Sequence, residues 1–214
     1  MIPLLTAGRY ETFFLVLVAI VLSLSFHEFG HAWSAKRFGD DTAERLGRLT
    51  INPISHIEPL GLLMVVLIGF GWARPVPTNP RNFTHPLAGA LIAAAGPAVN
   101  LVIAIVAANV FAVAVSSGWG VAASPIAGQF FYLLVYINVL LMLFNLIPLG
   151  PLDGHYILPH LLSTNLSRRY VELNARYGAM ALLGIVALSY AGLPVFGWLR
   201  ATARRVIDTI TVLG

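Results

Sequence analysis

The stretch FFLVLVAIVLSLSFHEFGH, residues 13–31, runs from a continuous apolar segment straight into a pair of histidines. Its only formally charged side chain is Glu28. An apolar run of this length is typical of a helix that crosses a lipid bilayer. In such a helix His27 and His31 are one turn apart and lie on the same face. Ionisable groups are costly inside a membrane, so the stretch predicts a functional site within a membrane span.

The composition of the whole chain agrees with a membrane protein. Hydrophobic residues make up 58% of the 214 residues and charged residues 10%, against about 25% charged residues in ordinary soluble domains. We expect a single integral-membrane domain over residues 1–214, with no separate soluble domain. The absence of cysteine excludes disulfides and a thiolate metal site. The 13 lysines and arginines flank apolar segments instead of forming one patch, which argues against nucleic acid as a partner.

The positions of lysine and arginine predict how the chain crosses the membrane. Four basic residues follow the first apolar run: Lys36, Arg37, Arg45 and Arg48. Residues 116–128 contain none. By the positive-inside rule the first span ends in the cytoplasm and 116–128 lies outside. We therefore expect further spans at 87–115 and 129–150, and a further apolar segment at 178–193 that is somewhat short for a span.

The apolar segment Gly61–Trp72 has predicted cytoplasmic flanks on both sides. As a helix it would rise about 18 Å, against about 30 Å for the hydrocarbon core. We interpret it as a re-entrant element, the alternative being a full span extended back to Ile54. The predicted fold class is an all-α polytopic membrane protein, a bundle of about four to five transmembrane helices with this re-entrant or hairpin element after the first helix. Residues after Pro194 could form an amphipathic surface helix.

An H-E-x-x-H motif on a helix can bind one Zn²⁺ through both histidines, with the glutamate beside the water that attacks. Catalytic zinc usually has a third protein ligand. Asp153 is the only formal charge between Asn82 and Ser167, and topology places it at the inner end of the 129–150 span. A carboxylate beside lipid needs compensation, which a metal shared with His27 and His31 would supply. Glu44 and Glu58 are weaker candidates because both lie in predicted loops.

Three segments resemble the site-2 protease family of intramembrane zinc metalloproteases: HEFGH at 27–31, AGPAVN at 95–100 and NLIPLGPLDG at 145–154. The likeness extends from about Phe13 to Gly154. It implies that His27, His31 and Asp153 bind one Zn²⁺ per chain. It also implies that Glu28 is the catalytic base and that Asn145 holds substrate or stabilises the oxyanion. Many members carry a PDZ or CBS domain, and this chain resembles a minimal form without either.

The resemblance implies hydrolysis of peptide bonds within or near the transmembrane segment of single-span membrane proteins. A substrate helix must unwind before water can attack it, so we expect helix-weakening residues near its cytoplasmic end. The expected partners are the lipid bilayer and these substrates. The expected location is a prokaryotic inner membrane, with the active site toward the cytoplasm. The alternative is an ion or zinc transporter, or a metal-binding scaffold without proteolysis. Against it stand Glu28 and the lack of a second ligand cluster or an inverted repeat.

Other residues carry weaker expectations. Asn138 is expected to hydrogen-bond a neighbouring helix, and Asn100 either to approach the site or to belong to a kinked helix crossing. His56 and His85 are expected to be solvated, and His155 to lie at an interface. The prolines at 75 and 77 predict an extended segment over 71–77, which could pair with an unwound substrate strand.

Overall fold

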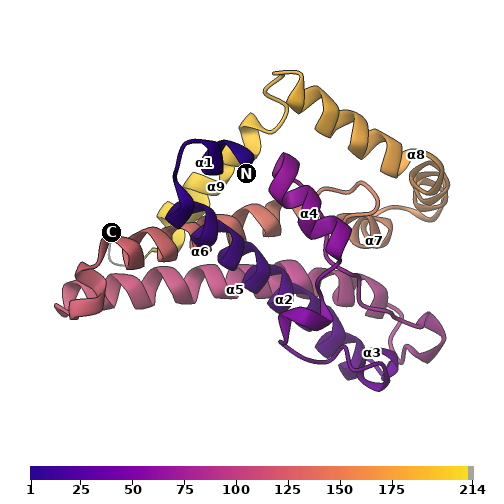
Figure 1. The fold of residues 1–214 in the computed structure, drawn as a ribbon. Coiled ribbons are helices and arrows are strands. Elements are labelled where there is room, and N and C mark those ends of the chain that lie inside the picture. Colours follow the sequence, from indigo (N-terminus) through magenta and orange to yellow (C-terminus); the bar gives the residue numbers. More distant parts are fainter. Residues whose placement is uncertain (212–214) are drawn as a thin grey trace.

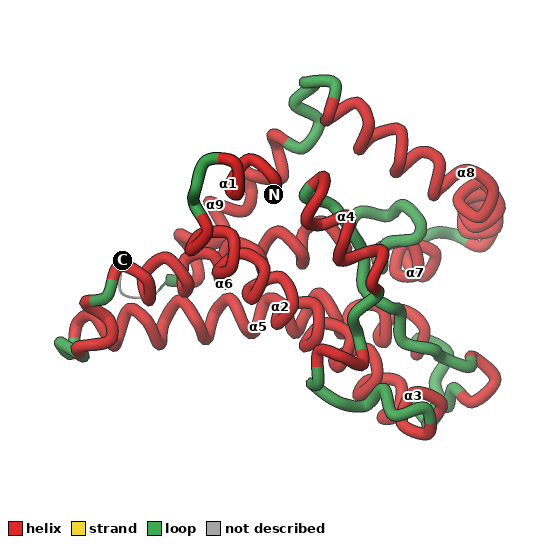
Figure 2. The backbone as a smooth tube through the Cα atoms, viewed as in Figure 1, coloured by secondary structure: helices red, strands yellow, loops and turns green. Residues whose placement is uncertain are grey.

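In the computed structural model residues 1–211 are described, and every regular element among them is a helix (Figure 2). The elements follow in the order α1 (Ile2–Thr6), α2 (Tyr10–Arg37), α3 (Thr42–Arg45), η1 (Pro53–Ser55), α4 (Pro59–Ile68), η2 (Pro80–Asn82), α5 (Ala88–Ser116), η3 (Gly120–Ala123), α6 (Pro125–Asn145), α7 (Gly154–Ile157), η4 (Leu158–Leu161), α8 (Thr164–Tyr190) and α9 (Gly197–Ile210).

Four helices are long and apolar enough to cross a membrane: α2, α5, α6 and α8, with 28, 29, 21 and 27 residues. This confirms the predicted all-α polytopic fold. The first three lie where the sequence predicts spans. They pack against one another as the centre of the molecule, and α9 packs on α6 and α5 (Figure 1).

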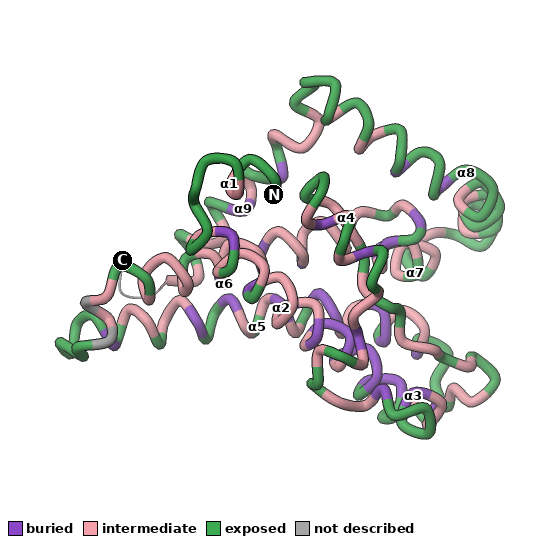
Figure 3. Tube along the Cα trace, viewed as in Figure 1, coloured by how far each residue is buried: buried purple, intermediate pink, exposed green. Residues whose placement is uncertain are grey.

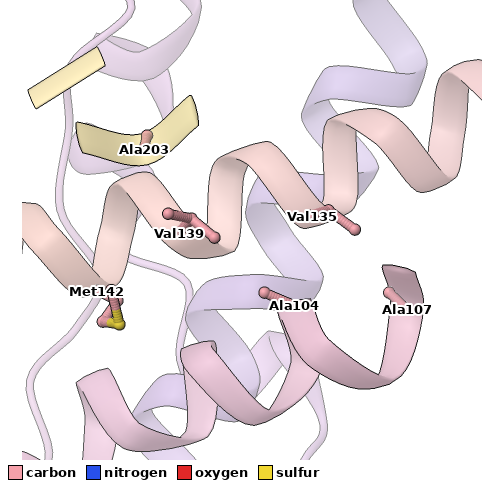
Figure 4. Close-up of a cluster of buried hydrophobic side chains, with 6 residues drawn as sticks. All are labelled: Ala104, Ala107, Val135, Val139, Met142 and Ala203. Carbon is pink, nitrogen blue, oxygen red and sulfur yellow. The ribbon is translucent and has the colours of Figure 1, made fainter. Parts of the chain in front are cut away.

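The centre of the bundle is built from small side chains that let helices approach closely. Ala104 and Ala107 of α5 face Val135 and Val139 of α6, and Ala203 of α9 closes the cluster (Figure 4). Small residues at helix contacts are characteristic of membrane bundles, in which van der Waals packing replaces the hydrophobic effect as the driving force.

Polarity along α5 and α6 is inverted relative to a water-soluble protein. Asn100 and Asn138 are completely buried, whereas Val102, Val106 and Val110 are 58%, 54% and 49% exposed. Buried amides with exposed valines fit a surface that faces lipid, where apolar side chains need no cover and amides must find internal partners. The chain is therefore an integral membrane protein.

The segment after α2 forms a short helix and then doubles back on it, which is consistent with the re-entrant interpretation. Its helix, α4, has 10 residues and rises about 15 Å, too little to span a bilayer. Gly69 ends α4 with a left-handed φ of 75°. Residues 70–79, here called the returning segment, contain no helix and lead back along α4. A side chain at Gly61 would strike the backbone of Trp72, and one at Gly71 would strike the backbone of Gly61, so glycine permits this return.

The region after Asp153 differs in part from expectation. The apolar segment at 178–193 belongs to a longer helix, α8, which begins at Thr164 and includes Arg168, Arg169 and Arg176. Most of α8 is exposed, and it packs mainly on η4 (Figures 1 and 3). The amphipathic helix expected after Pro194 is α9, but it docks on the bundle through Leu199 and Ala203 instead of lying free.

Buried polar groups tie the loops between α2 and α5 together. The carboxylate of Asp40, which is completely buried, accepts hydrogen bonds from Thr42, from the backbone N–H of Asn79 at 2.6 Å and from Asn82 Nδ2 at 2.9 Å. Burial disfavours the charged form, yet these hydrogen bonds keep the pKa of Asp40 below its usual value. The end of α2 is thereby fixed to the returning segment at Asn79.

Candidate metal centre

The C-terminal half of α2 presents two imidazoles to α5. His27 and His31 are 4% and 8% exposed, and their ring centroids lie 4.6 Å apart. The spacing of four residues places both rings on one helix face, as the sequence predicts.

Two glycines allow the rings to lie against the backbone of α5. A Cβ atom at Gly30 would come within 2.8 Å of Val99 Cγ2, so α2 and α5 cross closely there. A Cβ atom at Gly96 would strike His31 Nε2 and lie 2.7 Å from His27 Cε1. The imidazoles therefore fill the space that a side chain at position 96 would need.

Each imidazole is oriented by an acceptor on α5. His31 Nδ1 lies 2.7 Å from the carbonyl oxygen of Ile92. A carbonyl can only accept, so Nδ1 carries the proton and Nε2 presents a lone pair. His27 Nδ1 lies 2.6 Å from Asn100 Oδ1, which places His27 in the same tautomer. Ligand histidines commonly donate their second N–H in this way.

Asp153, far along the chain, completes the cluster. Its Oδ2 lies 3.2 Å from His27 Nε2, its Oδ1 lies 3.4 Å from His31 Nε2, and the two Nε2 atoms are 3.0 Å apart. One ligand atom from each of the three residues lies within 4.8 Å of the others.

These atoms fit a divalent metal by their chemistry. With both protons on Nδ1, two nitrogen lone pairs and a carboxylate face one another, and Asp153 Oδ2 is buried without a hydrogen-bond donor among the described residues. Converging acceptors repel unless a cation lies between them. A tetrahedral zinc with bonds of about 2.0–2.1 Å needs ligand atoms about 3.3 Å apart, close to the separations here.

The loop that carries Asp153 is held from two sides. A Cβ atom at Gly154 would lie 2.6 Å from the carbonyl oxygen of Ile147, so glycine lets the loop fold back on the end of α6. On the other side α8 supplies two hydrogen bonds. The Gly150 N–H donates to Asn174 Oδ1 at 2.8 Å, and the Tyr170 hydroxyl donates to the carbonyl of Pro148 at 3.0 Å.

Glu28 lies between the two histidines on α2 and is 8% exposed. Its Oε2 accepts the backbone N–H of Val76 at 3.1 Å, which brings the returning segment over this carboxylate. Arg48 holds that segment by donating to the carbonyls of Arg74 at 2.6 Å and Pro75 at 3.3 Å. Burial lowers the pKa of Arg48, although the charge of Glu28 acts in the opposite direction.

Residues 71–77 contain no helix, in agreement with the extended conformation that their prolines predict. The N–H groups of Arg74 and Val76 already donate to His56 and Glu28, and Pro75 and Pro77 have no N–H. A substrate strand that paired along 74–77 would have to use carbonyl groups or displace one of these two bonds.

The expectation that His56 is solvated is wrong. Its ring is 1% exposed, because Nε2 bonds the carbonyl of Thr50 at 2.7 Å and Arg48 packs beside it. His85 is exposed, as expected, and His155 is partly buried against Tyr156. Glu44 pairs with Lys36 and is outside the metal cluster.

Three asparagines have distinct surroundings. Asn145 Nδ2 donates to Leu141 of its own helix at 3.0 Å, so its contact with a reacting group stays a prediction. Asn138 bonds Ser23 and Asn100 on neighbouring helices, as expected of an interhelical amide. Asn100 meets the site through His27, a contact that α-helical periodicity alone could not reveal.

Sequence comparison gives consistent relatives. A profile of Peptidase family M50 matches residues 15–186. YwhC of Bacillus subtilis strain 168, named as a candidate zinc metalloprotease, is 39% identical over 171 residues, or 78% of each chain. Rip2 of Mycolicibacterium smegmatis, named in the same way, is 35% identical over 155 residues, which are 70% of this chain and 58% of Rip2. Rip2 of Mycobacterium tuberculosis H37Rv is 31% identical over 165 residues, or 74% of this chain and 61% of Rip2. No solved structure matches the chain.

Proposed function

This chain belongs to Peptidase family M50, the site-2 protease family of zinc metalloproteases, and we propose that it cleaves single-span membrane proteins within or near their membrane span. It does so with one Zn²⁺ held by His27, His31 and Asp153. The observation that carries the proposal is the convergence of three acceptor atoms within 4.8 Å, two of them on a helix long and apolar enough to cross a membrane.

The protein groups around this centre have different roles in peptide hydrolysis. Bound Zn²⁺ supplies Lewis-acid polarisation and makes water more acidic. Glu28, on the same helix turn as the two histidines, accepts the proton of the attacking water and delivers it to the leaving amine. Asn145, at the end of α6, donates to the negative charge that develops on the carbonyl oxygen, a contact worth about 3 kcal/mol where it has been measured by mutation.

The membrane setting defines the substrate. The ligands lie toward the end of α2 that leads into the basic loop, so cleavage occurs near the cytoplasmic face of an inner membrane. A helical substrate hides its peptide bonds in its own hydrogen bonds, and substrates with helix-weakening residues at that depth are therefore preferred. The lipid bilayer and single-span proteins are the partners, and residues 1–214 act as one domain.

Cleavage of a panel of labelled single-span proteins in liposomes tests this function, with Glu28→Gln as the variant. Loss of the base should lower the rate by about 10²–10⁴-fold, while the variant still binds one zinc per chain. The exposed His85→Ala change serves as a control for handling and should leave cleavage intact. Full activity of Glu28→Gln would contradict the assignment of the base. Zinc flux into sealed vesicles without cleavage would favour a transporter.

A further inference from the structure

Three buried polar side chains lead away from the metal centre into the bundle. Ser23, Asn100 and Asn138 come from α2, α5 and α6, and each has 0% of its surface exposed. None of them belongs to the metal cluster or can touch solvent. They are hydrogen-bonded to one another, and the series ends at His27 Nδ1.

The orientation of Asn100 follows from its neighbours. Its Nδ2 lies 3.2 Å from the backbone carbonyl of Ser23 and 2.8 Å from Asn138 Oδ1. A backbone carbonyl is always an acceptor, so the atom facing it must be the amide nitrogen, and both amide protons are then used. The remaining atom, Oδ1, can only accept. His27 Nδ1, 2.6 Å away, must therefore donate.

The orientation of Asn138 is fixed by the same argument. Its Nδ2 donates to the backbone carbonyl of Leu134 at 2.8 Å and to Ser23 Oγ at 2.8 Å. Its Oδ1 is therefore the acceptor that Asn100 meets. The Ser23 hydroxyl donates a hydrogen bond to the carbonyl of Ala19 at 2.6 Å. Every donor in the series points the same way, and reversal of either amide would place two acceptors face to face in a dry interior.

We propose that Asn100 and Asn138 are positioning residues that keep the proton of His27 on Nδ1 and its Nε2 lone pair directed at the metal. Asn100 acts directly on the ring, and Asn138 acts through Asn100. The inference rests on the zinc site of the proposed function and adds to it the groups that select the tautomer of one ligand. His31 needs no such groups, because the backbone carbonyl of Ile92 performs the same task.

Zinc affinity of the purified full chain, measured by competition with a chelator, gives the first test. Loss of a hydrogen-bond partner of a ligand histidine typically weakens metal binding by about 10–100-fold. We expect a loss in this range for Asn100→Leu and a smaller loss, at least about threefold, for Asn138→Leu. The double variant should bind no more weakly than Asn100→Leu, because Asn138 acts only through Asn100.

Asn109→Leu is the matched control. It removes an amide from the same helix, α5, that bonds the carbonyls of Ile105 and Ile210 instead of the metal site. It should leave zinc affinity unchanged. Equal losses of affinity in Asn109→Leu and Asn138→Leu would overturn the inference, as would additive losses in the double variant.

The tautomer itself can be read by ¹⁵N NMR of the imidazoles in the metal-free protein. Wild type should show His27 with its proton on Nδ1, and Asn100→Leu should shift population to the Nε2–H form while His31 is unchanged. An unchanged His27 spectrum in Asn100→Leu would overturn the inference and leave the zinc site intact. Zinc bound with wild-type affinity by His27→Ala would instead contradict the proposed metal site itself.

Discussion

At Gly96 the backbone of α5 passes so close to the two imidazoles that no side chain fits between this backbone and the rings. A Cβ atom there would strike His31 Nε2 and lie 2.7 Å from His27 Cε1. Both rings are held by hydrogen bonds from Nδ1 to acceptors on α5. The rings therefore cannot move away from Gly96 without losing these hydrogen bonds. We predict that Gly96→Ala weakens zinc binding at least about 10-fold, through displacement of the ligands. Metal content after dialysis against a graded chelator series would measure it.

Gly89→Ala provides the comparison on the same helix. Its new methyl group would meet only Phe83 at 3.9 Å, an ordinary contact. Helix propensity favours alanine at both positions, so a difference between the two variants reports the collision alone. Retention of wild-type zinc affinity by Gly96→Ala would show that the rings sit elsewhere when the metal is bound.

Individual residues differ in how well their positions and contacts can be predicted from the sequence. The histidine spacing and the isolated charge of Asp153 predict a cluster, because helical periodicity and the cost of a buried carboxylate are properties of the chain itself. The burial of His56 was not predictable, because it depends on contact with Arg48. That contact forms within an irregular loop, which has no periodic sequence pattern. The link from Asn100 to His27 also needs the rotation of two helices about their axes, which no single-helix pattern contains.

Among the elements, the long apolar helices were predictable, whereas only the second half of α8 was. The helices α2, α5 and α6 are continuous apolar runs, and their positions follow from length and hydropathy. The first half of α8 contains Arg168, Arg169 and Arg176, so hydropathy separates it from the apolar half that follows. The helix continues through this change in polarity because the segment contains no glycine or proline before Gly178, so its helix propensity stays favourable.

The element α8 reaches the metal centre through Asn174. Its Oδ1 accepts the N–H of Gly150 at 2.8 Å, in the loop that carries Asp153. We predict that Asn174→Ala frees this loop and weakens zinc binding about threefold to 10-fold, less than loss of a ligand's own partner. Chelator competition would measure the change. Asn165→Ala, at an exposed position of the same helix, should have no effect, and equal effects of both variants would argue that α8 stability, not the Gly150 bond, is responsible.

At the scale of the whole molecule, buried amides and exposed valines place the bundle in lipid, and the basic loops then orient it. The end of α2 that carries His27 and His31 leads into Lys36, Arg37 and the basic residues of the following loop. The opposite end of the bundle, between α5 and α6, has no lysine or arginine over 116–128. By the positive-inside rule we therefore propose that the metal centre lies toward the cytoplasm.

The orientation can be tested with single cysteines, since the natural sequence has none. Ser117→Cys lies at the end of α5 and Ser163→Cys at the start of α8, and both serines are exposed. In intact bacterial cells a membrane-impermeant maleimide should label position 117 and reach position 163 only after permeabilisation. The two changes are chemically identical, so each controls for the reactivity of the other. Labelling of position 163 in intact cells, with protection of 117, would reverse the orientation and place proteolysis on the outer face. Labelling of both would show that α6, the long helix between the two positions, does not carry the chain across the membrane.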